Sequence, residues 1–294
     1  MEVNTRILVC SWKEEIKEKT KMIYELLGRK PHLAIIVAED YSGPSSIYVN
    51  NKKKTGNELG ADVTIYYLKW KDRKEQDVRN ELFETIAKFN KDKCIDGIIV
   101  QLPFPYVSEE EISGRINPYK DVDGFTPYQK HLLSEGRKEA LVPCTAKGVM
   151  RMIEEELEEI EGKTVVIVNR SNLIGKPLAK LALTKNMTPI ICHSKSDRRL
   201  LGIGEVIVTG CGLRKNFNGL DVSSKTDLII DCSMNKVEGI EGVGDFDKED
   251  VIDMWPFTKI ASGYGHTGPM TVVALYENLV IATQNHIKKC FNNG

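Results

Sequence analysis

The sequence predicts an α/β protein of two domains, each built on a parallel β-sheet. Apolar runs of strand length alternate with amphipathic helical segments along most of the chain, and this alternation is typical of doubly wound sheets covered by helices. The chain has 294 residues, a length at which a single hydrophobic core usually divides. A proline-rich stretch over residues 102–145 interrupts the alternation, so we place the domain boundary near its end.

The first half of the chain predicts an α/β unit. Residues 13–28 have the spacing of an amphipathic helix, which Gly28 can end. Residues 33–38 are continuously apolar, as in a parallel strand covered on both faces. The next predicted elements are a helix over 45–60, a strand over 63–67, a helix near 75–90 and a strand over 96–101.

The second half repeats the alternation. A helix begins at Thr145, and a last helix runs from Pro269 to about Lys289. Strand and helix units in repetition predict a right-handed, doubly wound parallel sheet. Its strands are expected near residues 164–168, 188–192, 205–209 and 227–231.

One strand, turn and helix in the second half could bind a nucleotide. The turn reads Asn169-Arg-Ser-Asn-Leu-Ile-Gly175 and follows an apolar strand. Such a turn leaves backbone N–H groups at the helix start, where a pyrophosphate can bind. Only Gly175 of a Gly-x-Gly-x-x-Gly pattern is present. A nucleotide site and a plain packing turn both fit this segment.

The residues after the next strand bear on the choice of nucleotide. An acidic residue about 20 positions beyond the glycine turn selects the ribose 2′-hydroxyl of NAD, whereas Arg and small hydroxyl side chains accommodate the 2′-phosphate of NADP. Arg170 and Ser171 follow the first strand, and the first acid after the second strand is Asp197. His193 and Ser194 precede it. The pattern favours NADP over NAD, and His193 could also be a structural histidine at a strand end.

Three positions in the first half could carry chemistry. Tyr48 and Lys52 are four residues apart on a predicted helix and project from one face. A phenol beside a buried amine could handle protons, although the run 52–54 of three lysines also fits a solvated surface. Gln101 ends a buried strand, where polar groups face the ligand crevice of an α/β sheet. Capping the strand end is its alternative role.

Metal sites are not expected. Lys120-Asp-Val-Asp123-Gly carries two carboxylates but lacks the further acids of a calcium loop; hydrogen bonds from a ligand ring edge are the alternative. The five histidines form no His-x-x-x-His pair and the seven cysteines no Cys-x-x-Cys pair, which argues against zinc. Reduced, buried thiols of a cytosolic protein fit this cysteine usage.

Charge and hydropathy exclude other classes of function. With 41 basic and 42 acidic residues the net charge is −1, so no overall field attracts nucleic acid or an anionic membrane. No apolar run approaches the roughly 18 residues that span a bilayer, and no apolar leader opens the chain. We therefore expect a small ligand and neither secretion nor membrane insertion.

Taken together, these segments resemble the bifunctional methylenetetrahydrofolate dehydrogenase/cyclohydrolase family of folate one-carbon metabolism, over nearly the whole chain. Short motifs carry the resemblance by their order and spacing: Tyr48-Val-Asn-Asn-Lys52, Asp96-Gly-Ile-Ile-Val-Gln101-Leu-Pro-Phe-Pro105, Lys120-Asp-Val-Asp123-Gly-Phe125, Pro143-Cys-Thr145, Arg170-Ser171-Asn172, Gly175-Lys-Pro177, Cys192-His-Ser-Lys195, Ile230-Asp231, Gly244-Asp245 and Gly268-Pro-Met-Thr271. The resemblance implies a folate-binding catalytic domain over residues 1–144, completed by the C-terminal helix (about 270–294), and a Rossmann-type dinucleotide-binding domain over 145–269. It also implies a cytoplasmic homodimer that serves purine biosynthesis.

The resemblance implies two reactions, hydride transfer from 5,10-methylenetetrahydrofolate to NADP and hydrolysis of the methenyl product to 10-formyltetrahydrofolate. Lys52 would handle the proton as water adds, with Gln101 holding it. Tyr48 would stack on the folate, and Asp123 would hydrogen-bond the pterin. The other implied folate contacts are Leu102, Pro103, Gly268, Pro269 and Thr271, and the implied dinucleotide contacts are Asn169, Arg170, Ser171, Gly175, His193, Ser194, Thr209 and Gly210. Hydride transfer itself needs positioning more than acid–base help.

The chain departs from the family's pattern at several places. Asn169 stands where the family usually has Gly, and its bulk would alter how closely the backbone meets the cofactor. Residues 264–267 replace a Pro-Gly-Gly-Val loop beside the folate, residues 128–131 are also altered, and two extra residues lie between Val37 and Tyr48. These departures keep two alternatives open, a dehydrogenase without cyclohydrolase activity and a silent folate- or nucleotide-binding paralogue. A generic two-domain oxidoreductase would leave Lys52, Gln101 and Asp123 unexplained.

Overall fold

The structure is a computed structural model that describes residues 1–39, 44–237, 240–263 and 265–292. The side chains of residues 44–48, 236–237, 240–241 and 289–292 lie outside the described part. The chain forms two compact units. One, the three-stranded unit, comprises Trp12–Val142 and Leu275–Gly294; the other, the five-stranded unit, comprises Met1–Ser11 and Pro143–Ala274.

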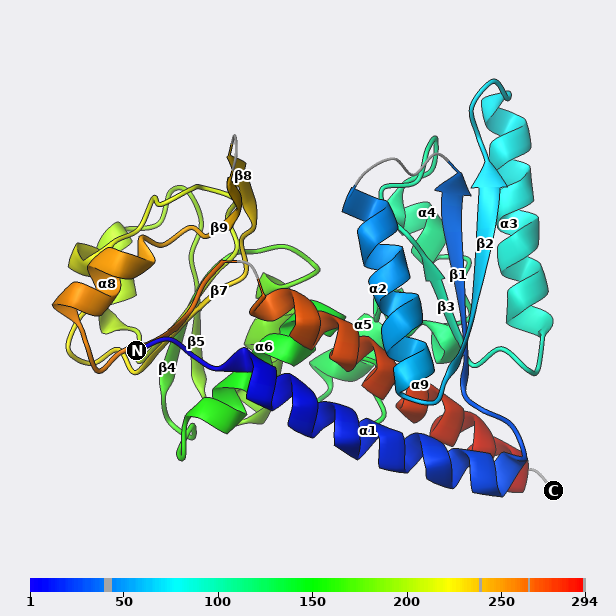
Figure 1. The fold of residues 1–294 in the computed structure, drawn as a ribbon, viewed down its shortest axis with the longest axis horizontal. Helices are drawn as coiled ribbons and strands as arrows, with labels where there is room; N and C mark the ends of the chain where they lie inside the picture. The colour runs from blue at the N-terminus through cyan, green and yellow to red at the C-terminus, as the bar shows by residue number, and fades with distance from the viewer. Residues whose placement is uncertain (40–43, 238–239, 264, 293–294) are drawn as a thin grey trace. The chain divides into compact units, whose positions relative to one another are not determined.

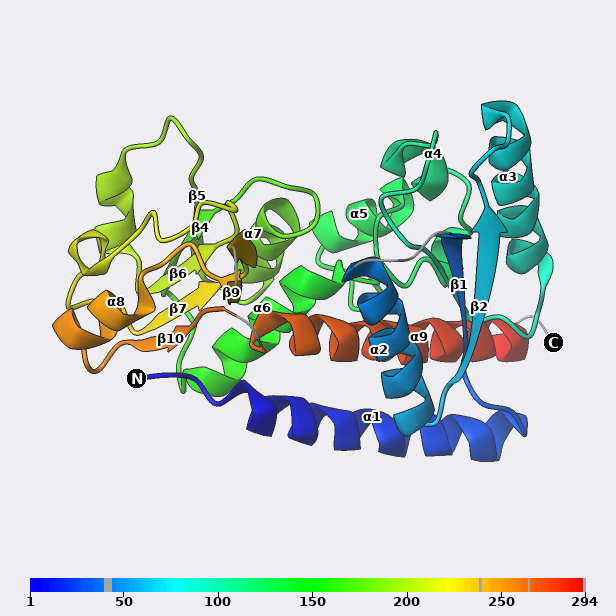
Figure 2. The same cartoon turned by 45° about the horizontal axis from the view of Figure 1, so that its top comes forward.

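The three-stranded unit is built around strand β1 (His32–Glu39). Among the described residues, β2 (Asp62–Lys69) pairs with it in parallel on one side and β3 (Gly97–Val100) on the other. Helices α2 (Pro44–Glu58) and α3 (Glu75–Lys91) lie on opposite sides of this sheet (Figures 1 and 2). The interior of β1 is therefore fully buried, which explains its uninterrupted apolar run.

The remaining helices of this unit lie partly in the proline-rich stretch that interrupts the predicted alternation. α4 (Glu109–Ser113) begins with a capping box between Ser108 and Glu111, and α5 (Pro127–Ser134) has Thr126 as its N-cap. Both starts carry the residue types that satisfy free N–H groups. The two long helices are α1 (Thr5–Leu27) and α9 (Thr267–Asn292). α1 begins well before the predicted residue 13.

The five-stranded unit contains a parallel sheet with the order β10-β7-β6-β4-β5 within the described residues. Its strands are β4 (Thr164–Val168), β5 (Thr188–Ile191), β6 (Val206–Thr209), β7 (Leu228–Asp231) and β10 (Lys259–Ala261). Val166, Ile207, Ile229 and Ile260 are neighbours across four strands and belong to one buried cluster. The doubly wound fold class is therefore confirmed.

Helices and short strands complete the five-stranded unit. α6 (Cys144–Glu156) precedes β4, α7 (Gly175–Thr184) connects β4 to β5, and α8 (Lys248–Met254) precedes β10. The antiparallel pair β8 (Asn235–Val237) and β9 (Ile240–Val243) and the three-residue β10 were not predicted. Strands this short give too few residues for a periodic pattern.

Residues Met1–Ser11 belong to the five-stranded unit, whereas our domain prediction grouped residues 1–144 together. Val3 N donates to Ile260 O at 3.0 Å, and Ile260 N donates to Met1 O at 2.8 Å. The segment thus extends the sheet beside β10. Backbone pairing with a strand so far along the chain leaves no local signal in the sequence.

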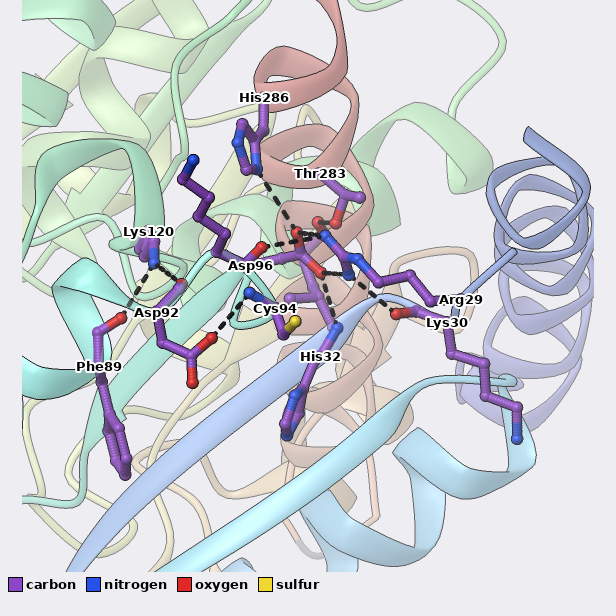
Figure 3. Close-up of polar contacts among 12 residues, drawn as sticks. Arg29, Lys30, His32, Phe89, Asp92, Cys94, Asp96, Lys120, Thr283 and His286 are labelled. Carbon is purple, nitrogen blue, oxygen red and sulfur yellow. Dashed lines mark hydrogen bonds and ion pairs between the residues drawn. The ribbon is translucent and has the colours of Figure 1, made fainter. Parts of the chain in front are cut away.

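Polar contacts stabilise the edge of the small sheet where its strands begin (Figure 3). Asp96, just before β3, is buried and receives two hydrogen bonds from the Arg29 guanidinium, at 2.6 and 2.9 Å, and a third from His32 N at 2.9 Å. The buried Lys120 ammonium donates to Phe89 O and to Asp92 O, at the end of α3. A cation at a helix C-terminus is the favourable arrangement, so this edge is organised for stability.

No helix in the described residues is both long enough and apolar enough to cross a bilayer.

Gly56 provides a test of the packing between α2 and α9. A Cβ atom at this buried position would lie 2.5 Å from both Tyr276 Oη and Val63 Cγ2. We expect Gly56→Ala to lower the free energy of unfolding by roughly 1–3 kcal/mol, although Gly to Ala inside a helix ordinarily stabilises. Urea or thermal unfolding of the whole chain measures this. The control is Gly268→Ala in α9, where nothing lies within 4 Å of the added atom; equal effects of the two changes would contradict the prediction.

Candidate functional site

Lys52 and Gln101 meet at the carboxyl ends of the strands in the three-stranded unit. Lys52 lies on α2, which follows β1, and Gln101 directly follows β3. Lys52 Nζ donates to Gln101 Oε1 at 3.0 Å, and Gln101 Nε2 donates to Leu102 O at 3.1 Å. Both side chains are half-buried, whereas Lys53 and Lys54 are exposed. The interpretation as a solvated surface therefore holds for Lys53 and Lys54, and the amide of Gln101 holds the amine of Lys52.

Tyr276 supports Lys52 from α9, and the sequence analysis missed it. Its hydroxyl donates to Lys52 O at 2.5 Å, and the ring is 1% exposed. Burial raises the pKa of Tyr276, which keeps the phenol protonated as a donor. Gly56, one turn after Lys52, leaves the space for this ring. No sequence signal connects residues 224 positions apart.

The two carboxylates of the 120–124 motif have different environments. Asp121 is buried and accepts hydrogen bonds from Gly124 N at 3.0 Å and Thr126 N at 2.6 Å. Its burial raises its pKa to about 6. Asp123 is half-buried and lines, with Leu102, a cavity of about 20 Å³, which holds about one water molecule. Asp121 thus shapes the turn, while Asp123 lies beside the Gln101 segment.

The other residues expected to contact folate are placed as follows. The side chain of Tyr48 lies outside the described part of the chain; its backbone belongs to α2, one turn before Lys52. Pro103 follows Gln101 and Leu102 directly. Gly268, Pro269 and Thr271 lie in the first turns of α9, in the five-stranded unit. The structure therefore brings Lys52, Gln101, Leu102 and Asp123 together within one unit.

The altered loop at residues 264–267 is tied to the start of the chain. Tyr264 lies outside the described residues, as do residues 40–43 of the stretch with the expected insertion. His266 Nδ1 lies 2.6 Å from Thr5 Oγ1, and His266 Nε2 lies 3.2 Å from Glu2 Oε1. These contacts lie within the five-stranded unit. His266 thus links the loop to the chain start.

A cavity of about 670 Å³ opens at the carboxyl ends of β4, β5 and β6. Its volume lies in the range of small-molecule and cofactor sites. Six of the residues expected to bind the dinucleotide line it, namely Asn169, Arg170, Ser171, His193, Ser194 and Gly210. Gly175 begins α7 beside it, and Thr209 is fully buried at the end of β6. The strand order reverses between β4 and β6, which is where α/β sheets bind ligands.

The charges in this cavity suit a phosphate group. Asp197 lines it, but the Arg199 side chain binds the Asp197 carboxylate at 2.5 Å and lowers its pKa to about 2. Arg170 and Arg198 also line the cavity. The Asp197 carboxylate is therefore matched by Arg199, the Arg198 guanidinium binds the Asp221 carboxylate, and the Arg170 guanidinium belongs to the lining as well. Basic and hydroxyl donors of this kind fit a 2′-phosphate, and the residues present fit a nicotinamide dinucleotide.

Asn169 organises the turn between β4 and α7. Its Oδ1 accepts hydrogen bonds from Ser171 N at 2.8 Å, Ser171 Oγ at 2.7 Å and Gly175 N at 3.1 Å. Its Nδ2 donates to Gly210 O at 2.6 Å. A Cβ atom at Gly175 would lie 1.9 Å from Asn169 O, so Gly is required there. Asn169, where the pattern would have a glycine, thus makes the hydrogen bonds that hold the turn together.

Asp245 holds the loop after β6, and the sequence analysis assigned it no role. This fully buried carboxylate accepts hydrogen bonds from Cys211 N and Leu213 N, both at 2.7 Å. Cys211 and Leu213 line the cavity. The Gly244-Asp245 pair is a visible motif, but only the tertiary structure shows which backbone groups it binds. In the described residues, no cluster of three His, Cys, Asp or Glu side chains could hold a metal ion.

Comparisons with known proteins agree over most of the chain. The family model described as the catalytic domain of tetrahydrofolate dehydrogenase/cyclohydrolase matches residues 4–123, and that of its NAD(P)-binding domain matches residues 143–287. The chain is 37% identical over 277 residues to the bifunctional protein FolD of Nitrosopumilus maritimus, covering 92% of this chain and 93% of the relative. The relative of that name from Acetivibrio thermocellus is 35% identical over 284 residues, covering 93% and 95%. The crystal structure of the bifunctional enzyme FolD, methylenetetrahydrofolate dehydrogenase/cyclohydrolase, from Campylobacter jejuni has a TM-score of 0.88 at 31% identity and covers 97% of this chain and 99% of that chain.

The titration of Asp121 gives a test of its burial. Its pKa of about 6 in the folded protein lies above the unfolded value of about 3.9, so the folded state keeps a proton that the unfolded state releases. Stability from this group is then lost as pH rises from about 4 to about 6, by at most roughly 3 kcal/mol for two pKa units. Urea unfolding of the wild type and of Asp121→Asn at several pH values measures the difference. Asp253→Asn, at an exposed position, controls for the substitution; a wild type that gains stability over Asp121→Asn across this window would contradict the prediction.

Proposed function

The chain belongs to the tetrahydrofolate dehydrogenase/cyclohydrolase family, and we propose which of its residues perform the two reactions. The protein oxidises 5,10-methylenetetrahydrofolate to the 5,10-methenyl form with a nicotinamide dinucleotide, and it hydrolyses the methenyl form to 10-formyltetrahydrofolate. The observation that carries our assignment is the hydrogen bond of 3.0 Å between Lys52 Nζ and Gln101 Oε1, at the carboxyl edge of the small sheet.

Lys52 is the residue that we assign to the hydrolytic step. Water that adds to the cationic methenyl carbon must lose a proton, and an amine within reach can accept it. Gln101 offers a neutral carbonyl oxygen to Nζ, so it positions the amine without the countercharge that a carboxylate would bring. Tyr276 anchors the backbone of Lys52 from the other side. A dehydrogenase without cyclohydrolase activity would have no need of this arrangement.

Folate binding is assigned to side chains near this pair. Asp123 is proposed to accept hydrogen bonds from the pterin, since paired hydrogen bonds to a carboxylate are strong, and Leu102 lies beside it. Tyr48, Pro103, Gly268, Pro269 and Thr271 are proposed as further folate contacts, because they occupy the matching positions of the family's motifs.

The dinucleotide is proposed to be NADP, bound in the 670 Å³ cavity of the five-stranded unit. When bound, it supplies the hydride acceptor, and the protein's part is to orient it. Arg170 and Ser194 would hold the 2′-phosphate, with His193 beside them. Ser171, Gly175, Thr209 and Gly210 would complete the contacts. The pairing of Asp197 with Arg199 supports NADP over NAD, because that acid is already engaged.

We also propose a cytoplasmic homodimer whose formyl product serves purine biosynthesis. The absence of Cys-x-x-Cys pairs from the sequence fits a reducing compartment. Sedimentation analysis of the purified protein tests the dimer, and a monomer at micromolar concentration would contradict it.

Replacing Lys52 should separate the two activities. We expect Lys52→Ala to lower the rate of methenyltetrahydrofolate hydrolysis by about 100-fold or more, the usual loss when a general base is removed. Formation of reduced dinucleotide should change only a few-fold. Decay of methenyl absorbance and appearance of reduced dinucleotide measure the two steps separately. Lys54→Ala, an exposed position on the same helix, is the matched control; equal hydrolysis by the wild type and Lys52→Ala would refute the assignment.

Replacing Arg170 should reduce the preference for NADP. Loss of a charge-assisted hydrogen bond costs about 1.5–3 kcal/mol, so we expect Arg170→Ala to lower kcat/KM for NADP by roughly 10- to 100-fold. The value for NAD, which lacks the 2′-phosphate, should fall much less. Initial rates with both dinucleotides measure this. Lys176→Ala, exposed and at the start of α7, is the control, and an equal loss with NADP and NAD would place Arg170 away from the 2′-phosphate.

A further inference from the structure

The backbone donors at the start of α7 are already hydrogen-bonded within the protein. Ser171 N and Gly175 N donate to the Asn169 side chain, Ile174 N donates to Ser171 Oγ at 3.1 Å, and Lys176 N donates to Ser171 O at 3.1 Å. In a strand, turn and helix of this kind, such N–H groups normally face the pyrophosphate of a dinucleotide. The turn of this chain therefore has an internal acceptor where an anion would be expected.

That acceptor is a single oxygen atom. Asn169 Oδ1 accepts three hydrogen bonds, two from backbone N–H groups and one from the Ser171 hydroxyl. Converging backbone donors of this sort form a concave site for an anion. The amide is held in this position by its other end, where Nδ2 donates to Gly210 O at 2.6 Å. Asn169 and Gly210 both line the cavity, so the amide lies at the wall that a dinucleotide would contact.

We propose that the Asn169 amide stands in for a pyrophosphate oxygen in the free protein and leaves the Gly175 N–H when the dinucleotide binds. The inference rests on the proposed placement of the dinucleotide in this cavity. Phosphate oxygens accept stronger hydrogen bonds than a neutral amide oxygen, so the exchange is favourable. It nevertheless costs the hydrogen bonds that Asn169 makes, and this cost lowers the affinity for the dinucleotide.

The Asn169 amide affects the binding of both dinucleotides equally. NADP and NAD share the pyrophosphate and differ only in the 2′-phosphate, which the proposed function assigns to Arg170 and Ser194. Asn169 therefore sets the affinity common to the two, whereas Arg170 and Ser194 set the discrimination between them. Asn169 and Arg170, which are neighbours in one turn, therefore have separate roles.

Removal of the amide tests the proposal. We expect Asn169→Gly to tighten the binding of NADP and of NAD by the same factor, roughly fivefold to tenfold, since about one net hydrogen bond no longer has to be broken. The free variant should unfold at a lower temperature than the wild type, because its turn has lost four hydrogen bonds. Inorganic pyrophosphate should compete with NADP more effectively in Asn169→Gly than in the wild type. Isothermal titration calorimetry and thermal unfolding measure these effects.

Two further variants make the outcome decisive. Asn172→Gly, in the same turn, removes an exposed amide that accepts only from the Lys176 side chain in the described contacts; it should leave both affinities unchanged, which separates loss of the amide from a gain of backbone freedom. Arg170→Ala tests the proposed placement of the dinucleotide in the cavity. If Arg170→Ala weakens NADP binding but Asn169→Gly leaves it unchanged or weakens it, Asn169 does not replace a pyrophosphate oxygen. The placement of the dinucleotide in the cavity then still holds. If Arg170→Ala has no effect on NADP binding, the placement is wrong.

Discussion

In both sheets the strand that comes first in the chain lies between the second and the third strand. β1 lies between β2 and β3, and β4 lies between β5 and β6. The segments that follow the two strands at such a reversal must turn toward opposite faces, which opens a crevice at the carboxyl ends. Lys52 and Gln101 lie at one reversal, and Asn169 and Gly210 lie at the other. The location of the chemistry therefore follows from the strand order of each unit.

Loops at these crevices contain backbone groups that no strand or helix can satisfy, and buried polar side chains satisfy them instead. Asp245 binds two N–H groups after β6, Asp121 binds two in the 120–126 turn, and Tyr276 binds the carbonyl of Lys52. Each contact fixes a segment that carries a proposed site residue. Such fixed groups need little reorganisation when ligand binds, which is the basis of electrostatic preorganisation. At the opposite edge of the small sheet, Arg29 and the backbone of His32 bind Asp96 where the strands begin.

The turn at Asn169 shows how one substitution changes both folding and binding. With Asn at this position, the turn is hydrogen-bonded before any ligand arrives. The stability of the free protein and the affinity for a dinucleotide are then coupled through the same donors. A glycine at this position would leave the donors unpaired in the free protein and available to the ligand. The residue at this position therefore sets the balance between the stability of the free protein and its affinity for a dinucleotide.

The sequence by itself determined the fold class, the strands with strong apolar runs and the residue types at each crevice. Periodicity and burial of parallel strands are local properties, and so is the position of Gln101 or Arg170 at a strand end. The short β10, the pairing of residues 1–3 with it and the support of Lys52 by Tyr276 were decided only by the tertiary structure. The same holds for Asn169, whose four hydrogen bonds include one to the loop after β6. Contacts between distant segments depend on how elements pack, and no local pattern records them.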